Sequence, residues 1–175
     1  NGDGLSDDTQ SNVASLPVNS AGAAMLHNRG LQPLETGYIT LAVASQFELR
    51  RVYPLPYPAS NPAQPANFEV FPFGFVGLEI TSIPSGGSVD LLLYYPEVSL
   101  PDTVYAFGST PGDVLPHWYP FLYDGSTGAE LTRLPNEKIM LTLHFQDGAR
   151  GDNDLTPNGI ITTLFGSAVT TKNIY

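Results

Sequence analysis

The stretch Glu137-Lys138-Ile139-Met140-Leu141-Thr142-Leu143-His144-Phe145 has an apolar residue at every second position from Ile139 onward. This alternation places Ile139, Leu141, Leu143 and Phe145 on one face. A period of two is the pattern of a strand with one buried face and one exposed face. The stretch therefore predicts a half-buried β-strand, which leads directly into an acidic loop at residues 146–154.

Other strand-length runs recur along the chain, and Pro- or Gly-containing turns separate them. They are residues 13–18 (a strand or the end of a short helix), 38–44, 47–52, 68–80, 89–95, 103–108, 117–123, 160–165 and 167–171. The runs on either side of the turn Ile83–Ser88 fit a hairpin or a sandwich edge. Residues 53–67 contain five prolines, which is typical of an extended loop.

No segment of ten or more residues has a convincing helical period. The sequence therefore predicts an all-β fold, an antiparallel β-sandwich (Ig-like or jelly-roll-like) with long Pro-rich loops. A length of 175 residues suffices for one domain with a full core. We expect a single sandwich domain over residues 13–175, preceded by residues 1–12 as a linker or the remnant of a calcium repeat.

The composition is that of a secreted β-protein. Charged residues make up only 14% of the chain, while 17 Gly and 16 Pro are present. A net charge of −10, with seven scattered basic residues, argues against nucleic acid or an anionic membrane as a partner. The absence of cysteine excludes the class of secreted domains stapled by disulfides. No apolar stretch approaches the length of a membrane-spanning helix.

The first residue is Asn rather than Met, and no signal peptide is recognisable. We therefore expect a mature product or a fragment of a larger protein, located outside the cell or on the surface of a bacterium or archaeon.

Six of the ten aspartates lie in two short Asx- and Gly-rich clusters. Calcium binds six to eight oxygen ligands, which alternating Asx residues around a glycine turn can supply. The sequence therefore predicts bound Ca²⁺ with candidate ligands Asn1, Asp3, Asp7, Asp8, Asp147, Asp152, Asn153, Asp154 and Asn158. Asx and Gly residues are also the usual turn formers, so each cluster has an alternative explanation as a turn without metal.

The first cluster, Asn1–Asp8, matches positions three, five, six and nine of a calcium loop with the D-x-D-x-D-G pattern. Its first ligand would lie before Asn1. One hypothesis is that oxygens of a neighbouring subunit complete this site, and that the strand-like run 167–171 adds to a sheet edge of the neighbour. The chain would then assemble head to tail.

The stretch from Val89 to Ile161 resembles a family of bacterial extracellular modules, the choice-of-anchor U type of C-terminal surface domain. The resemblance rests on the motifs Tyr105–Pro111, His117–Gly128 and Asp147–Ile160. Asn1–Asp8 is similar to the end of a thrombospondin-type-3-like calcium repeat, and an Asn-Val-Ala-Ser-Leu-Pro run like Asn12–Pro17 often follows such a repeat. The resemblance implies a calcium-binding surface module near the end of a larger protein, and not an enzyme.

No residue pattern points to catalysis. The chain contains no Gly-x-Ser-x-Gly, no His-Glu-x-x-His and no phosphate-binding glycine loop, and its three histidines do not have zinc-site spacing. Arg150-Gly151-Asp152 matches the integrin-binding tripeptide, but such a short match arises easily by chance. We therefore do not assign adhesion to it.

The aromatic run 117–123, which includes His117 and Trp118, is either a core strand or a platform on which sugar rings stack. The main hypothesis is a calcium-binding structural or adhesive surface module that contacts neighbouring subunits or the rest of a larger surface protein. The alternative is a carbohydrate-binding module that uses residues 117–123 to bind a glycan. A glycoside-active domain is the third class, and the sequence favours it least.

Overall fold

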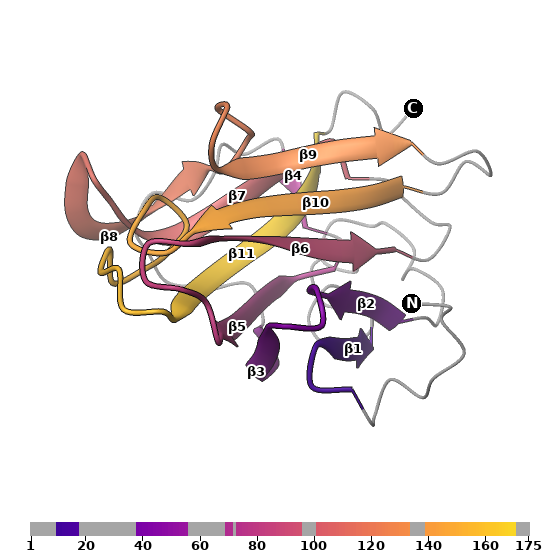
Figure 1. Cartoon of the computed structure of the whole chain (residues 1–175). Coiled ribbons are helices and arrows are strands. Elements are labelled where there is room, and N and C mark those ends of the chain that lie inside the picture. Colours follow the sequence, from indigo (N-terminus) through magenta and orange to yellow (C-terminus); the bar gives the residue numbers. More distant parts are fainter. Residues whose placement is uncertain are drawn as a thin grey trace.

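The computed structural model describes residues 10–17, 38–55, 69–71, 73–95, 101–133 and 139–170. Their strands are β1 (Val13–Pro17), β2 (Tyr38–Ala42), β3 (Glu48–Leu55), β4 (Glu69–Val70), β5 (Phe75–Thr81), β6 (Ser88–Tyr94), β7 (Thr103–Thr110), β8 (Asp113–Pro120), β9 (Gly128–Arg133), β10 (Ile139–Gln146) and β11 (Ile161–Thr170). They form two antiparallel sheets packed face to face (Figure 1). The predicted antiparallel β-sandwich is confirmed. Over the same residues, no helix is long and apolar enough to cross a membrane.

One sheet has five strands in the order β1-β2-β6-β10-β9. The other has six, in the order β3-β5-β11-β7-β8 with β4 paired to the end of β11. The strand with the clearest alternation, β10, lies between β6 and β9. Its residues Leu141, Leu143 and Phe145 are at most 1% exposed, so the inner face of β10 belongs to the shared core. Ile80, Ile161 and other apolar side chains of the opposite sheet complete this core.

The hairpin interpretation of β5 and β6 is wrong. β5 pairs with β3 and β11, whereas β6 pairs with β2 and β10 in the other sheet. The connection at residues 82–87 therefore crosses between the sheets. Ser82 and Gly86 take left-handed φ values of 67° and 73° in this connection, and the side chain of Ile83 is buried beneath it.

Two predicted boundaries also shift. The runs 160–165 and 167–171 form a single strand, β11, because Gly166 continues the extended backbone. β3 continues through Tyr53–Leu55, which the sequence had placed in the Pro-rich loop. Pro54 is tolerated there because β3 is an edge strand, where a missing N–H need not break a ladder.

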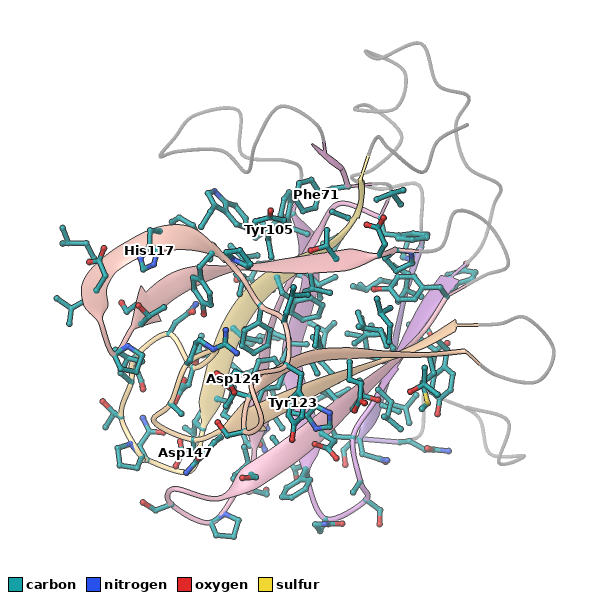
Figure 2. The ribbon with its side chains drawn as sticks, turned by 90° about the horizontal axis from the view of Figure 1, so that it is seen from above. Phe71, Tyr105, His117, Tyr123, Asp124 and Asp147 are labelled. Carbon is teal, nitrogen blue, oxygen red and sulfur yellow. The ribbon has the colours of Figure 1, made fainter. Side chains whose placement is uncertain are left out.

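A second apolar layer covers the outer face of the six-stranded sheet. Phe71 and Phe75 are at most 1% exposed and form its centre, with their ring centroids 4.7 Å apart. Tyr105 and Trp118 pack against them from β7 and β8. Figure 2 shows Tyr105 beside Phe71. The six-stranded sheet is therefore apolar on its inner face and on this part of its outer face.

Three connections meet at one end of the sandwich: residues 82–87, residues 121–127, and the loop 147–160 between β10 and β11. Figure 2 shows Asp124 and Asp147 near each other at this end. We call it the loop end. Hydrogen bonds link the loop 147–160 to both other connections, for example from Gly86 N–H to Asp147 and from Arg150 to Leu122 O.

Candidate functional site

The predicted calcium ligands fall into two groups. Asn1, Asp3, Asp7 and Asp8 lie outside the described residues. The second group lies in the loop 147–160 and consists of Asp147, Asp152, Asn153, Asp154 and Asn158. This loop crosses the loop end because β10 and β11 belong to different sheets. Each of the five makes a different set of contacts.

Asp147 is 3% exposed and joins two connections. Its Oδ2 accepts the N–H of Gly86 at 2.8 Å and of Gly159 at 2.9 Å. Its Oδ1 is buried, and none of the described residues provides a hydrogen-bond partner for it. A buried carboxylate oxygen without a partner is costly, so this atom is where the loop is ready to accept a ligand.

Asp152 is 0% exposed, and both of its carboxylate oxygens accept backbone N–H groups. Oδ2 accepts from Gly148 at 2.9 Å and Oδ1 from Thr162 at 3.1 Å. Burial raises the pKa of Asp152 to about 6, against the lowering effect of these two bonds, and the charges of Asp154 and Asp147 raise it further. Asp152 is therefore close enough to Asp154 and Asp147 for their charges to repel its carboxylate.

Asp154 and Asn158 are exposed and stabilise a turn. Asp154 Oδ1 accepts the N–H of Thr156 at 2.8 Å, and its Oδ2 accepts Asn158 Nδ2–H at 2.8 Å. Asn158 Oδ1 accepts the N–H of Ile160 at 2.9 Å. These contacts are those of turn-forming Asx residues. The side chain of Asn153 instead packs onto the backbone of Gly108 in β7, where a Cβ atom would collide with it.

The donor set limits how a cation could bind here. Within the described ranges, no three His, Cys, Asp or Glu side chains converge as a metal site. A calcium ion in this loop would therefore be bound by Asp147 Oδ1 and at most one further carboxylate, with amide and backbone carbonyl oxygens completing the shell. Calcium accepts such mixed oxygen ligands.

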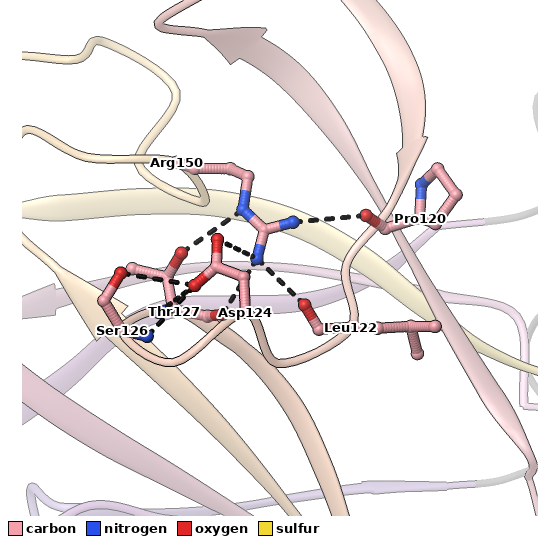
Figure 3. A network of polar contacts seen from close by, with 6 residues as sticks. All are labelled: Pro120, Leu122, Asp124, Ser126, Thr127 and Arg150. Carbon is pink, nitrogen blue, oxygen red and sulfur yellow. Dashed lines mark hydrogen bonds and ion pairs between the residues drawn. The ribbon is translucent and has the colours of Figure 1, made fainter.

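Arg150 clamps the loop 147–160 to the connection 121–127 (Figure 3). Its Nη2 donates to Thr127 O at 2.8 Å and to Leu122 O at 2.9 Å, and lies 3.0 Å from Asp124 Oδ2. The guanidinium carbon also lies 5.1 Å from the ring centroid of Phe121. These contacts hold the two loops together at a partly buried cation.

Asp124 stabilises its own turn on the other side of this clamp. Its Oδ1 accepts the N–H groups of Ser126 and Thr127, both at 3.0 Å. The bonds from Thr127 and then Ser126 lower the pKa of Asp124, and Arg150 lowers it further. No side-chain pattern in the sequence indicated this clamp.

The tripeptide Arg150-Gly151-Asp152 is not presented as a flexible recognition loop. Arg150 uses its donors on the connection 121–127, and Asp152 is fully buried with both oxygens bonded. The geometry therefore gives no support to adhesion through this tripeptide.

The aromatic run divides between two layers. Tyr119 and Phe121 are buried in the central core, whereas Trp118 packs between Phe75 and Phe107 at centroid distances of 4.7 and 5.0 Å. Tyr123 is 47% exposed and lies 4.7 Å from the ring of His144. These side chains do not form one continuous exposed surface on which sugar rings could stack.

Comparisons with protein-family models, with curated proteins and with solved structures find no significant match. The resemblance of Val89–Ile161 to the choice-of-anchor U domain therefore stays a hypothesis. The geometry of the loop end is the basis for a functional proposal.

Proposed function

We propose that this chain is a calcium-stabilised β-sandwich module with a structural or adhesive role in a secreted or surface-displayed protein, and without catalytic activity. The observation that carries the proposal is Asp147 Oδ1, a buried carboxylate oxygen without a partner among the described residues. It lies in the same loop as Asp152, whose carboxylate the charges of Asp154 and Asp147 repel. A divalent cation would satisfy that oxygen and neutralise part of the repulsion.

A cation at Asp147 would act on the whole loop end. Asp147 already bonds Gly86 in one connection and Gly159 in its own loop, and Arg150 ties the same loop to Thr127. Fixing one carboxylate would therefore stiffen three connections at once. Such a site suits a module that must hold its shape outside the cell, next to neighbouring subunits or other domains.

The glycan-binding alternative gains no support from Trp118. Its ring is partly buried between Phe75 and Phe107, so stacking on a sugar would require it to leave the second apolar layer. The calcium-stabilised module is therefore the function that the geometry favours.

Thermal unfolding with calcium and with chelator tests the proposal. Binding to the folded state alone stabilises by about 2.7 kcal/mol at a hundredfold excess over Kd. For a domain of this size that corresponds to a rise in Tm of about 5–10 °C. Magnesium should have a much smaller effect because it keeps its water shell and demands octahedral geometry.

The variant Asp147→Asn distinguishes a loss of calcium binding from a loss of stability. Its Tm in calcium is compared with its own Tm in chelator, which gives its calcium-dependent rise in Tm. We expect that rise to disappear in Asp147→Asn. It should persist in the control Asp90→Asn, which changes an exposed carboxylate on the outer face of β6. An unchanged wild-type Tm in calcium and chelator would refute the proposal.

A further inference from the structure

Among the described residues, one edge of β6 has a partner strand along only about half of its length. β10 pairs with β6 from Ser88 to Tyr94, whereas β2 pairs only with Leu92, Leu93 and Tyr94, because β2 ends at Ala42. In Figure 1, β6 runs well past the end of β2. The chain instead turns away at residues 43–47 toward β3 in the other sheet.

Two hydrogen bonds show which backbone groups of β6 face this gap. Asp147 N–H donates to Gly87 O at 2.9 Å, so the odd-numbered residues of β6 direct their N–H and C=O groups toward β10. On the other side, Val43 N–H donates to Asn12 O at 3.0 Å, so the even-numbered residues of β2 face β6. Both hydrogen bonds therefore indicate that the backbone N–H and C=O groups of Ser88 and Asp90 point toward the gap.

These groups have no backbone partner on that side among the described residues. The turn opposite closes on itself, since Phe47 N–H donates to Ala44 O at 2.9 Å. Ser88 and Asp90 therefore each offer one backbone donor and one backbone acceptor at this edge. Free donors and acceptors along an edge are what a sheet needs to accept an added strand.

A groove of about 500 Å³ lies along this edge, within the usual range for ligand sites. Val43, Phe47 and Val89 form its apolar part, while Gln46, Ser88 and Asp90 supply polar groups. Asp90 is the charged residue of the lining, and no described Lys or Arg pairs with it. His144 Nδ1, 2.8 Å from Asp90 Oδ1, holds this carboxylate in place.

We propose that this groove receives an extended peptide segment of a partner protein, which pairs with Ser88 and Asp90 as a short added strand and carries a Lys or Arg opposite Asp90. The alternation of side chains along a strand then turns the next peptide residue inward, toward Val43 and Phe47, so a small apolar residue fits there. The proposal does not depend on calcium.

Two synthetic peptides test it, acetyl-Ser-Lys-Val-Thr-Ser-amide and the same peptide with Glu in place of Lys. Backbone amide NMR should show fast hydrogen exchange at Ser88 and Asp90 in the protein alone. The Lys peptide should shift both signals and slow their exchange. It should bind about two- to fivefold more tightly than the Glu peptide, the strength of an exposed ion pair.

Three variants sharpen the test. Asp90→Asn should remove the preference for Lys, whereas Glu130→Gln should retain it, because Glu130 also contacts His144 but lies outside the groove lining. Ser88→Pro removes an edge donor without affecting a bond to β10, and should weaken binding of both peptides.

Any of three results would overturn the proposal. The first is slow exchange at Ser88 and Asp90 before peptide is added, which would mean that this chain or a second copy already covers the edge. The second is peptide-induced shifts that lie elsewhere, or no saturation at millimolar peptide. The third is a preference for Lys that survives in Asp90→Asn.

Discussion

At the scale of single residues, Arg150 holds the loop end together. Its bonds to Leu122 O and Thr127 O satisfy two backbone carbonyls that would otherwise lack these partners, and its charge meets Asp124. The guanidinium also donates from Nε to Thr127 Oγ1 and from Nη1 to Pro120 O, and the single nitrogen of an ammonium group cannot reach all of these acceptors at once. The clamp therefore depends on the shape of the side chain as well as on its charge.

Replacing Arg150 should consequently be costly. We expect Arg150→Ala to lower the free energy of unfolding by about 2–3 kcal/mol, because several bonds to a charged donor are lost and the Leu122 carbonyl loses its donor, while Thr127 O keeps the N–H of Asp124. Arg150→Lys should recover only part of this loss. Arg50→Ala is the control, since Arg50 is 63% exposed and pairs only with Glu48, and it should cost at most about 0.5 kcal/mol. Urea denaturation measures all three, and equal losses for Arg150→Ala and Arg50→Ala would contradict the clamp.

The buried Asp152 should make stability depend on pH. Its pKa is about 6 in the folded protein and about 4 when unfolded, so between these values the folded state keeps a proton that the unfolded state has lost. Raising the pH from about 4 to about 6 therefore removes stability, on the order of 1–2 kcal/mol.

The pH dependence of the unfolding free energy is compared between wild type and Asp152→Asn, with both proteins in chelator. The variant is expected to be less stable overall, because an amide can accept only one of the two N–H bonds. The decisive quantity is the change in unfolding free energy between pH 4 and pH 7. If that change is the same in both proteins, Asp152 does not titrate as described.

The residue types of this site could be predicted from the sequence, but their roles could not. Asx and Gly residues mark the loop 147–160, yet nothing local shows that Asp147 and Asp152 are buried while Asp154 is exposed. The partners of Arg150 are mostly backbone carbonyls 23 to 30 positions away in the chain. Backbone acceptors leave no signal in side-chain patterns, so the clamp could be found only in the folded structure.

At the scale of the elements, the edge strand β8 is protected against pairing with other chains. Phe121 N–H donates to Val104 O at 2.8 Å, so alternation directs the backbone of Pro120 away from β7 and toward the open edge. Proline has no N–H to offer there. In contrast, the gap beside β6 presents Ser88 and Asp90, which both retain their donors, and this difference favours β6 as a place for an added strand.

Close packing across β11 gives the next prediction. A Cβ atom at Gly166 would lie 2.6 Å from ring carbons of Phe75, which is itself fully buried. We therefore expect Gly166→Ala to destabilise the fold by about 1–3 kcal/mol through overpacking. Gly112→Ala, in the turn between β7 and β8, meets nothing within 4 Å and should be nearly neutral. Thermal unfolding measures the stability of both variants. If Gly166→Ala leaves stability unchanged, the aromatic layer can rearrange at little cost in free energy.

The strands themselves could largely be predicted from the sequence, because alternation and Pro or Gly turns are local signals. Membership of a sheet could not. The pair β5 and β6 fitted a hairpin in sequence, yet each strand pairs in a different sheet, since the choice depends on which distant strands share its edges. The extension of β3 through Pro54 has the same cause, because only its place at a sheet edge makes a proline acceptable there.

At the scale of the whole molecule, the loop end differs from the packed layers of the sandwich. The loop end gathers Asp147, Asp152 and Arg150, whose bonds join three connections through buried or partly buried polar groups. The layers between the two ends are apolar, with Leu91, Leu93 and Leu141 fully buried. A ligand that acts on polar groups should therefore change one end of the molecule and leave the core almost untouched.

Hydrogen exchange with and without calcium tests this division. If a cation binds at Asp147, chelator should speed amide exchange at Gly86, Gly148 and Gly159, because carboxylates whose positions the ion fixes accept their N–H groups. Exchange at Leu93 and Leu141, which lie in paired strands of the core, requires global unfolding, so chelator should speed it only by the factor that corresponds to the loss of global stability. The variant Asp147→Asn should show the exchange pattern of the chelated protein whether or not calcium is present. Unchanged exchange at the three glycines in chelator would contradict a cation at Asp147.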